Sequence, residues 1–335
     1  MNDEAFEMTM EGDTHKVIEF VQGSLGGSAV RIGQRGQCRY CGTTDARSFR
    51  HVAHAVPEAL GNKWIETLDE CDACNDIFSR YEDSLAKVIG PILTLGGTRG
   101  KRNAVRQTGR SGGVAVIRHD GAGKDRRLSV FVQGTINDHV GINPNTGELV
   151  FAVPVAPERF IPRHAYKALV KMGLGLLPLD ELKNFDRLRR WVLGPNDQET
   201  FADLVVGISF GAVGNAPALA AATLLKRCEG TPDNPYMVFV VSAGSVCFQI
   251  DLKSDQYDGG WPPGPSPLCG VKWSNVVGAP SCKKQIRIDY GDPIHLDWKA
   301  GDLQPSPLEK IIFNVHPATG RGRVTPVWRS TAQPT

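Results

Sequence analysis

Two cysteine pairs lie in the first quarter of this sequence: residues 38–41 read CRYC and residues 71–75 read CDACN. Twenty-nine residues separate the two pairs. A Cys-x-x-Cys turn presents two thiolates to one ion at about 2.3 Å, and two such turns complete the tetrahedron that structural zinc prefers. The spacing therefore predicts a structural Zn²⁺ site with four ligands, Cys38, Cys41, Cys71 and Cys74. Redox-active pairs and buried thiols without a metal are the alternatives.

The composition is that of a soluble globular protein, because 41% of the 335 residues are hydrophobic and 22% are charged. This excludes a disordered chain, and the length excludes a scaffold held only by disulfides. The remaining cysteines have no short spacing and are expected to pack in the core as reduced thiols: Cys228, Cys247, Cys269 and Cys282. Because the N-terminus is acidic where a signal peptide is basic, we predict a cytoplasmic protein.

The uncharged run Leu204–Leu225 is long enough to span a membrane. It contains Asn215, Pro217 and three glycines, which interrupt an apolar span. We therefore predict a strand, a turn and an Ala-rich helix here, and no membrane partner.

Residues 48–63 lie between the cysteine pairs and read SFRHVAHAVPEALGNK. Residues 50–56 are strand-like, and residues 57–62 carry a Gly-Asn turn signal. Residues 71–87 predict a helix that opens near Asp72 and carries apolar side chains at helical spacing. A unit this small has little core, so a bound metal is expected to supply much of its folding free energy.

In combination, these motifs resemble the zinc-containing HNH endonucleases of the ββα-metal class, over roughly residues 36–103. Phosphodiester hydrolysis needs a base with a pKa near neutral and a hard cation that stabilises charge on the phosphate. The resemblance implies that His54 is this base and that Asn75 supplies an oxygen ligand to Mg²⁺ or another divalent cation. It also implies that Asn62 holds the loop and orients the base. The alternatives are a core histidine for His54 and a helix N-cap for Asn75.

The two residues before His54 depart from the family pattern. Many HNH enzymes place an Asp, Glu or His directly before the base histidine, or a Glu two residues before it, whereas this chain has Val52 and Ala53 there. His51 is the nearest substitute as a catalytic-metal ligand, but it faces away from His54 on a regular strand unless a bulge intervenes. Water and substrate phosphate, or a degenerate site, are further alternatives. So is a carboxylate from elsewhere in the unit: Glu58, Asp76 or Glu82.

Basic residues concentrate after the predicted helix. Residues 99–127 contain nine basic and two acidic residues, an excess of +7 against +2 for the whole chain. We predict that this segment contacts nucleic-acid phosphates through Arg99, Lys101, Arg102, Arg106 and Arg110. A solvated linker is the alternative. Four further arginines near the first cysteine pair either offset the charge of a Cys₄ zinc site or contact a ligand: Arg35, Arg39, Arg47 and Arg50.

Beyond residue 112 the pattern predicts a larger mixed α+β domain. Helices are expected at 164–177 and 179–193, and strands at 113–117, 128–132, 149–153, 204–210, 236–243 and 246–252. One segment is similar to a recurring segment of proteins that carry this HNH type, without known chemistry: His164, Tyr166, Lys167 and Lys171. The histidines without metal or triad spacing are interpreted as surface or packing residues: His119, His139, His295 and His316.

The sequence thus predicts an α+β protein with a small zinc-stapled HNH unit and a larger α+β domain. The expected divisions are an N-terminal extension (1–34), the HNH unit with its basic segment (35–108), the larger domain (112–320) and a tail (321–335). The expected function is a metal-dependent DNA endonuclease, similar to restriction or phage-defence effectors. The alternatives are a non-catalytic zinc module that binds nucleic acid or protein, and a sensor whose larger domain binds a small-molecule activator. The choice between DNA and RNA, and pairing of two chains for double-strand cleavage, stay open.

Overall fold

The computed structural model describes most of the chain and confirms a mixed α+β fold. The described residues are 8–10, 14–23, 28–100, 102–110, 113–121, 127–194, 204–210, 220–231, 234–243, 246–259, 271–273, 286–288, 296–319 and 322–328. Within these ranges, no helix is long and apolar enough to cross a membrane.

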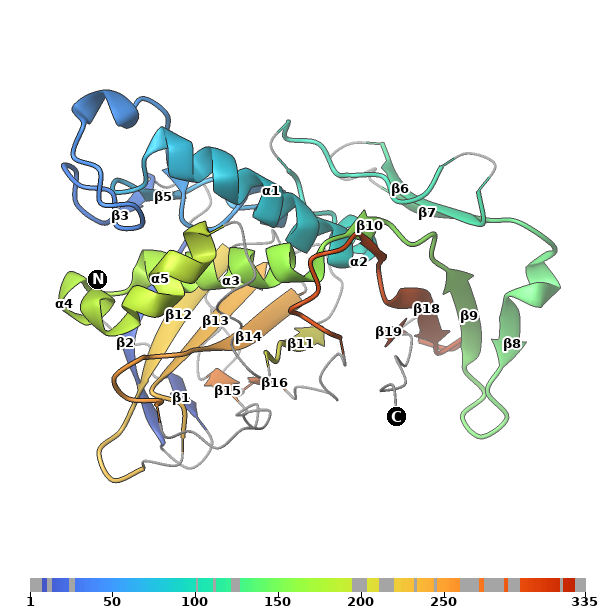
Figure 1. The fold of residues 1–335 in the computed structure, drawn as a ribbon. Helices are drawn as coiled ribbons and strands as arrows, with labels where there is room; N and C mark the ends of the chain where they lie inside the picture. The colour runs from blue at the N-terminus through green and yellow to red at the C-terminus, as the bar shows by residue number, and fades with distance from the viewer. Residues whose placement is uncertain are drawn as a thin grey trace.

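Helices gather on one side of a large sheet (Figure 1). The α-helices are α1 (Asp72–Val88), α2 (Gly90–Leu95), α3 (Pro162–Leu176), α4 (Leu179–Leu182) and α5 (Asp186–Leu193). Short 3-10 helices are η1 (Ala46–Ser48), η2 (Glu58–Leu60), η4 (Ile136–Asp138) and η5 (Lys183–Phe185). The predicted helices at 71–87 and 164–177 are confirmed as α1 and α3. The helix predicted at 179–193 is broken, because the Asn184 carbonyl accepts hydrogen bonds from Ser254 Oγ (3.0 Å) and the Asp255 N–H (3.2 Å).

The large sheet is antiparallel throughout, in the order β11-β14-β13-β12-β2-β1-β15-β16. Its strands are β1 (Met8–Met10), β2 (His15–Gln22), β11 (Gly207–Phe210), β12 (Ala220–Arg227), β13 (Met237–Ala243), β14 (Val246–Leu252), β15 (Val271–Trp273) and β16 (Ile286–Ile288). Helix α3 lies across β12–β14 and contacts β12 and β14 (Figure 1). The predicted strands at 204–210, 236–243 and 246–252 are confirmed in this sheet.

The predicted Ala-rich helix at the end of the run Leu204–Leu225 is wrong, because its last residues form β12. Strand β12 pairs with β2 on one side and β13 on the other, and these ladders satisfy its backbone groups. Long-range pairing thus overrides the helix propensity of alanine. The predicted turn at residues 211–219 lies outside the described residues.

The small unit is built from a three-stranded sheet and α1, in the strand order β3-β5-β4. Its strands are β3 (Val30–Ile32), β4 (Ala53–His54) and β5 (Ile65–Thr67). Strand β4 is shorter than the predicted strand at 50–56, because the N–H groups of Arg50 and His51 donate to the Asp72 carboxylate instead (3.3 and 3.0 Å). Gly61 ends η2 with φ +86°, and a Cβ there would lie 2.9 Å from the Thr98 methyl.

The remaining strands form smaller sheets beside the helices (Figure 1). They are a hairpin of β6 (Ala115–Asp120) and β7 (Arg127–Val132), a pair of β10 (Arg159–Phe160) and β17 (Gln304–Pro305), and the sheet β19-β18-β9-β8. This last sheet contains β8 (Val140–Ile142), β9 (Leu149–Pro154), β18 (Leu308–Val315) and β19 (Gly322–Trp328). Strands predicted at 113–117, 128–132 and 149–153 correspond to β6, β7 and β9.

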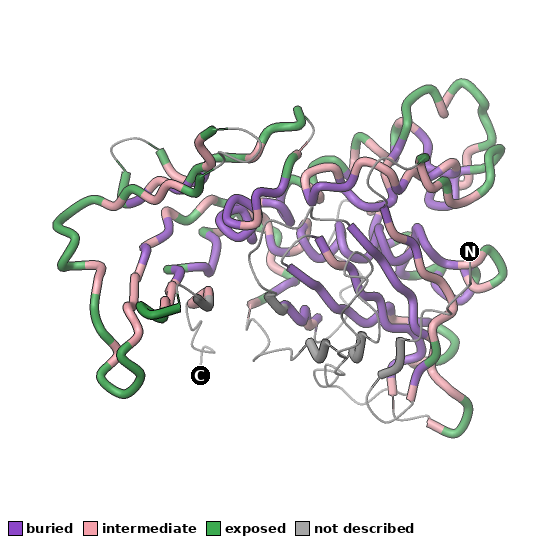
Figure 2. Tube along the Cα trace, turned by 180° about the vertical axis from the view of Figure 1, so that it is seen from behind, coloured by how far each residue is buried: buried purple, intermediate pink, exposed green. Residues whose placement is uncertain are grey.

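The predicted N-terminal extension contributes strands to both the large sheet and the small unit. Residues 15–22 of the predicted N-terminal extension form β2 inside the large sheet, and residues 30–32 pair with β5 of the small unit. A continuous cluster of buried residues runs from Phe78 on α1 through Leu169 on α3 to Phe239 on β13. Figure 2 shows this buried interior passing from the helices into the sheet. The small unit and the larger domain therefore pack around α3.

Candidate metal centre and adjoining cleft

The four cysteines predicted as zinc ligands lie together, with all of their Sγ atoms within 4.8 Å of one another. The Sγ atoms of Cys38 and Cys74 are 3.7 Å apart, and those of Cys41 and Cys71 are 3.6 Å apart. A disulfide would bring the sulfurs to about 2.05 Å. A tetrahedron with Zn–S bonds of about 2.3 Å has edges of about 3.8 Å. The cluster could therefore hold a metal ion such as zinc.

Local structure aims the cysteines at one point. In the first pair, the Gly42 N–H donates to the Cys38 carbonyl (2.9 Å), and Gly42 has φ +77°, a left-handed conformation that favours glycine. In the second pair, Cys71 is the N-cap of α1 and Cys74 lies in the first helical turn. The positive end of the helix dipole therefore lies beside the sulfurs and favours their ionisation.

The thiols differ in pKa, because a negative charge on one sulfur disfavours ionisation of its neighbours. The hydrogen bond with Cys74 lowers the pKa of Cys38 to about 4 and raises the pKa of Cys74 well above its ordinary value. Burial raises the pKa of Cys71 to about 11. A divalent cation among the four sulfurs would offset this mutual repulsion and stabilise all four thiolates.

The arginines near the first pair are held largely by carboxylates. Arg39 forms a buried ion pair with Asp69 (2.7 Å) and donates to the carbonyls of Leu174 and Leu177 at the end of α3 (2.8 and 3.1 Å). Two exposed arginines form ion pairs with nearby aspartates, Arg47 with Asp45 and Arg50 with Asp72. Arg35 is exposed. Arg39 thus joins the first cysteine pair to α3.

A cleft of about 520 Å³ lies beside the small unit and brings His54 together with Asn75. His54 comes from β4, and its Nδ1 is buried without a hydrogen-bond partner among the described residues. Helix α1 contributes Asn75, Ser79 and Glu82, whose i, i+4, i+7 spacing places them on one face. Sequence reasoning missed Ser79, although its spacing from Asn75 could have indicated it.

Asn62 lies in the buried loop between η2 and β5 and does not line the cleft. Its Nδ2 donates to the carbonyls of Val56 (2.6 Å) and Ile65 (2.9 Å). Its Oδ1 accepts from the N–H groups of Trp64 (3.0 Å) and Ile65 (2.9 Å). These bonds fix the loop backbone, which is part of the predicted role, and none of them goes to the His54 ring.

The structure does not bring His51 into the cleft. His51 is exposed, and its backbone N–H donates to Asp72. Of the alternative carboxylates, Glu58 and Glu82 line the cleft and Asp76 does not. Glu58 forms an ion pair with Lys63 (3.0 Å). Glu58 and Glu82 thus line the cleft together with His54, as does Asp83, although Val52 and Ala53 offer no ligand.

Among the predicted nucleic-acid contacts, Arg106 lines the cleft and forms an ion pair with Glu158. Arg99, Arg102 and Arg110 are exposed outside the cleft lining, and Lys101 lies outside the described residues. The basic segment therefore reaches the cleft through one described arginine.

The structure describes most of the histidines and cysteines interpreted from the sequence as packing or surface residues. His119 and His139 bond backbone carbonyls of Thr94 and Gln133, and His316 is exposed. Cys247 is buried and Cys228 is partly buried. Outside the described residues lie Cys269, Cys282 and His295.

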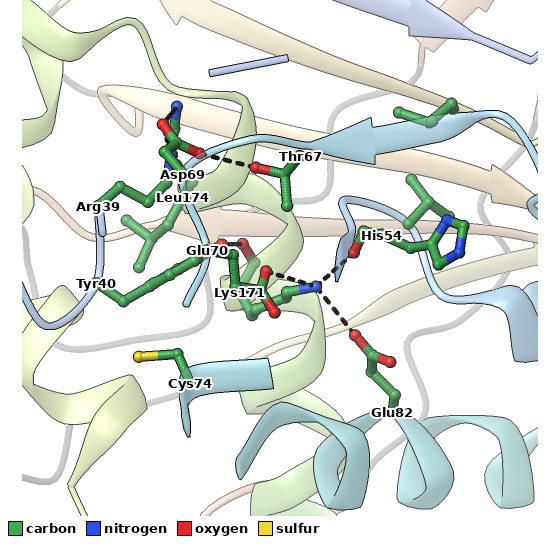
Figure 3. Close-up of polar contacts among 12 residues, drawn as sticks. Arg39, Tyr40, His54, Thr67, Asp69, Glu70, Cys74, Glu82, Lys171 and Leu174 are labelled. Carbon is green, nitrogen blue, oxygen red and sulfur yellow. Dashed lines mark hydrogen bonds and ion pairs between the residues drawn. The ribbon is translucent and has the colours of Figure 1, made fainter. Parts of the chain in front are cut away.

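A buried lysine, Lys171, contacts two residues that line the cleft, His54 and Glu82 (Figure 3). Lys171 Nζ on α3 donates to the His54 carbonyl (2.6 Å) and to Glu82 Oε1 (3.0 Å). It also forms an ion pair with Glu70 Oε2 (3.1 Å). The other residues of the recurring segment are placed elsewhere: Lys167 Nζ donates to the Gly194 carbonyl, and Tyr166 and His164 contact the rings of Trp191 and Tyr81.

Comparison with known proteins finds no family model, no curated protein and no solved structure that matches this chain. The resemblance to HNH endonucleases therefore rests on the motifs of this sequence.

Proposed function

We propose that this protein is a metal-dependent endonuclease of the HNH type that hydrolyses phosphodiester bonds in DNA. The observation that carries the proposal is the placement of His54 and Asn75, from β4 and α1, in one cleft. The four-cysteine cluster at the start of α1 supports it, because a zinc ion there would anchor the helix that carries Asn75.

In this mechanism, His54 accepts a proton from the attacking water. His54 is partly buried and lines the cleft, and its buried Nδ1 has no hydrogen-bond partner among the described residues. Asn75 and the carboxylates of Glu58 and Glu82 offer the oxygen ligands that Mg²⁺ prefers. When bound, such a cation would stabilise charge on the phosphate and on the leaving oxygen.

The arginines suit a polyanionic substrate. Arg106 in the cleft is placed to contact the phosphate, and Arg99, Arg102 and Arg110 are exposed along the same segment. We place the protein in the reducing cytoplasm, where the four thiols stay available to zinc. A restriction or phage-defence role fits such a nuclease.

The test is incubation of the purified protein with supercoiled plasmid in Mg²⁺ or Mn²⁺. We expect nicking, and a loss of at least about 100-fold in rate for His54→Ala, the usual contribution of a general base. Asn75→Ala should raise the metal concentration needed for half-maximal rate. His316→Ala, at an exposed histidine, is the control and should cut normally. Nicking that survives His54→Ala would overturn the assignment.

A second candidate function is a non-catalytic zinc module, favoured by the absence of a ligand at Val52 and Ala53. It predicts salt-sensitive retention of DNA in a gel-shift assay without cleavage in either metal. Cleavage that appears only after addition of a nucleotide would instead support a small-molecule sensor in the larger domain.

A further inference from the structure

The Lys171 side chain connects α3 to both elements that form the cleft. Its Nζ lies 2.6 Å from the His54 carbonyl on β4, 3.0 Å from Glu82 Oε1 on α1 and 3.1 Å from Glu70 Oε2 (Figure 3). Lys171 is fully buried, as is Glu70, at 0% and 2% exposure. The contacts with the His54 carbonyl and with Glu82 are hydrogen bonds, and the contact with Glu70 is an ion pair.

This arrangement tolerates little displacement. A buried charge is costly unless it is paired and hydrogen-bonded, so each of the three contacts opposes movement of the others. The Phe78 ring lies 5.7 Å from the Lys171 ammonium and contributes an apolar wall. Removing the ammonium would leave Glu70 buried without its cation.

Two of the three partners help to form the cleft. Strand β4 has only two residues paired with β5, so its own ladder holds His54 weakly. Glu82 lies on the same face of α1 as Asn75. By binding both β4 and α1, Lys171 sets the separation between His54 and the helix face opposite it.

The opposite side of α3 is fixed by the large sheet. At Gly173 an added Cβ would lie 2.9 Å from Leu252 and 3.2 Å from Phe239, so the helix backbone is pressed against β13 and β14. The Tyr40 hydroxyl also donates to the Lys171 carbonyl (2.9 Å). The position of Lys171 therefore depends on both the sheet and the first cysteine pair.

We propose that Lys171 is a positioning residue through which the large sheet sets the geometry of the cleft. The inference rests on the proposed function, since it assigns the larger domain a structural part in the same site. The larger domain is then a component of the nuclease site and not a separable module.

The test compares three variants of the full chain. Lys171→Met removes the charge, Lys171→Arg keeps it on a longer, planar group, and Lys167→Met is the matched control. Lys167 is equally buried and lies one turn away on α3; its Nζ donates to the Gly194 carbonyl and lies 5.5 Å from the centre of the Tyr81 ring, and neither of these residues lines the cleft. We expect Lys171→Met to lower kcat for nicking about 100-fold, the effect of a misplacement of about 1 Å, with KM for DNA unchanged. Lys171→Arg should lower kcat less, and Lys167→Met should keep kcat within about twofold.

Two measurements do not need cleavage. NMR gives the chemical shift of the C2–H proton of the His54 ring, and calorimetry gives the affinity for Mn²⁺. Both report on the cleft without cleavage of DNA. We expect Lys171→Met to shift the resonance and weaken Mn²⁺ binding about 10-fold, with Lys167→Met unchanged. If Lys171→Met does not fold, Lys171→Arg carries the same comparison, since it keeps Glu70 and Glu82 paired.

The inference is overturned if folded Lys171 variants keep the His54 resonance and the Mn²⁺ affinity, or if the Lys167 control changes both equally. A wild-type protein that binds Mn²⁺ and does not cut would instead refute the proposed function. In that case the resonance and the affinity still decide the role of Lys171.

Discussion

The small unit and the large sheet reach stability in different ways. Strands β3, β4 and β5 have three, two and three residues, whereas β12, β13 and β14 have eight, seven and seven. The long strands are mostly buried, and β13 pairs with β12 on one side and with β14 on the other along its whole length. Strands as short as β4 gain little from their own ladders, so the small unit relies on the cysteine cluster and on contacts from α3. The cysteine spacing and long-range contacts from α3 therefore support the small unit, whereas strand pairing and burial support the large sheet.

The largest expected effect is that of removing the metal, which should destabilise the small unit far more than the large sheet. Structural zinc contributes on the order of 10 kcal/mol to folding of small domains. We expect Cys38→Ser to lose bound zinc and to increase hydrogen exchange in residues 30–88, with residues 237–252 little affected. Zinc analysis and hydrogen-exchange mass spectrometry measure this. Cys228→Ser, outside the cluster, is the control. A wild-type protein that binds no zinc would contradict the prediction.

The buried ion pair within the small unit, whose arginine also donates to backbone carbonyls at the end of α3, should have the next largest effect. Arg39 and Asp69 are 3% and 2% exposed, and removing one partner of such a pair costs about 3–5 kcal/mol because it strands the other charge. We expect Arg39→Met to lower the free energy of unfolding by this amount in urea titrations. The exposed pair of Arg47 and Asp45 provides the comparison, and Arg47→Met should leave stability unchanged. Equal effects of the two substitutions would refute the assigned role of Arg39.

The contact of α3 with the sheet predicts a smaller effect. Gly173→Ala forces Leu252 and Phe239 to move, and overpacking of this kind costs about 1–3 kcal/mol, partly offset by the higher helix propensity of alanine, about 1 kcal/mol. We expect a net loss of about 1 kcal/mol in thermal unfolding. Leu252→Val should make the substitution less costly in a double-mutant cycle. Additive effects of the two changes would show that these side chains do not meet.

A buried histidine in β2 predicts the smallest effect. Burial lowers the pKa of His15, whose Nε2 bonds the Pro235 carbonyl (2.8 Å). Below pH about 6.5 the unfolded chain therefore binds a proton that the folded chain does not, so stability falls as the pH is lowered. The slope from one proton is at most about 1.4 kcal/mol per pH unit. We expect His15→Gln to flatten the stability profile between pH 7 and 5 and His316→Gln to leave it unchanged, as read from urea titrations. A steeper profile in His15→Gln would reverse the sign assigned here.

Prediction from sequence succeeded where the signal is local. The two cysteine pairs specified a cluster of sulfurs, and the apolar spacing after Cys71 specified α1. It failed where a distant group supplies the deciding bond. Asp72 shortens the strand predicted at 50–56, and β2 together with β13 turns an alanine-rich run into a strand. Neither partner is visible in a local window of residues.

The residues of the candidate site also fall into two groups, those predicted from the sequence and those that only the tertiary structure brings to the site. The sequence alone predicted the four clustered sulfurs, and it proposed His54 and Asn75 as candidates, because a motif records which residues occur at a given spacing. Only the tertiary structure decided that Ser79 and Glu82 share the cleft, that His51 does not, and that Lys171 contacts His54 and Glu82. The ammonium of Lys171 meets its partners more than 80 residues away along the chain. Such a contact exists only after α3 has packed between the small unit and the sheet, since burial creates the low dielectric that makes the pairing strong.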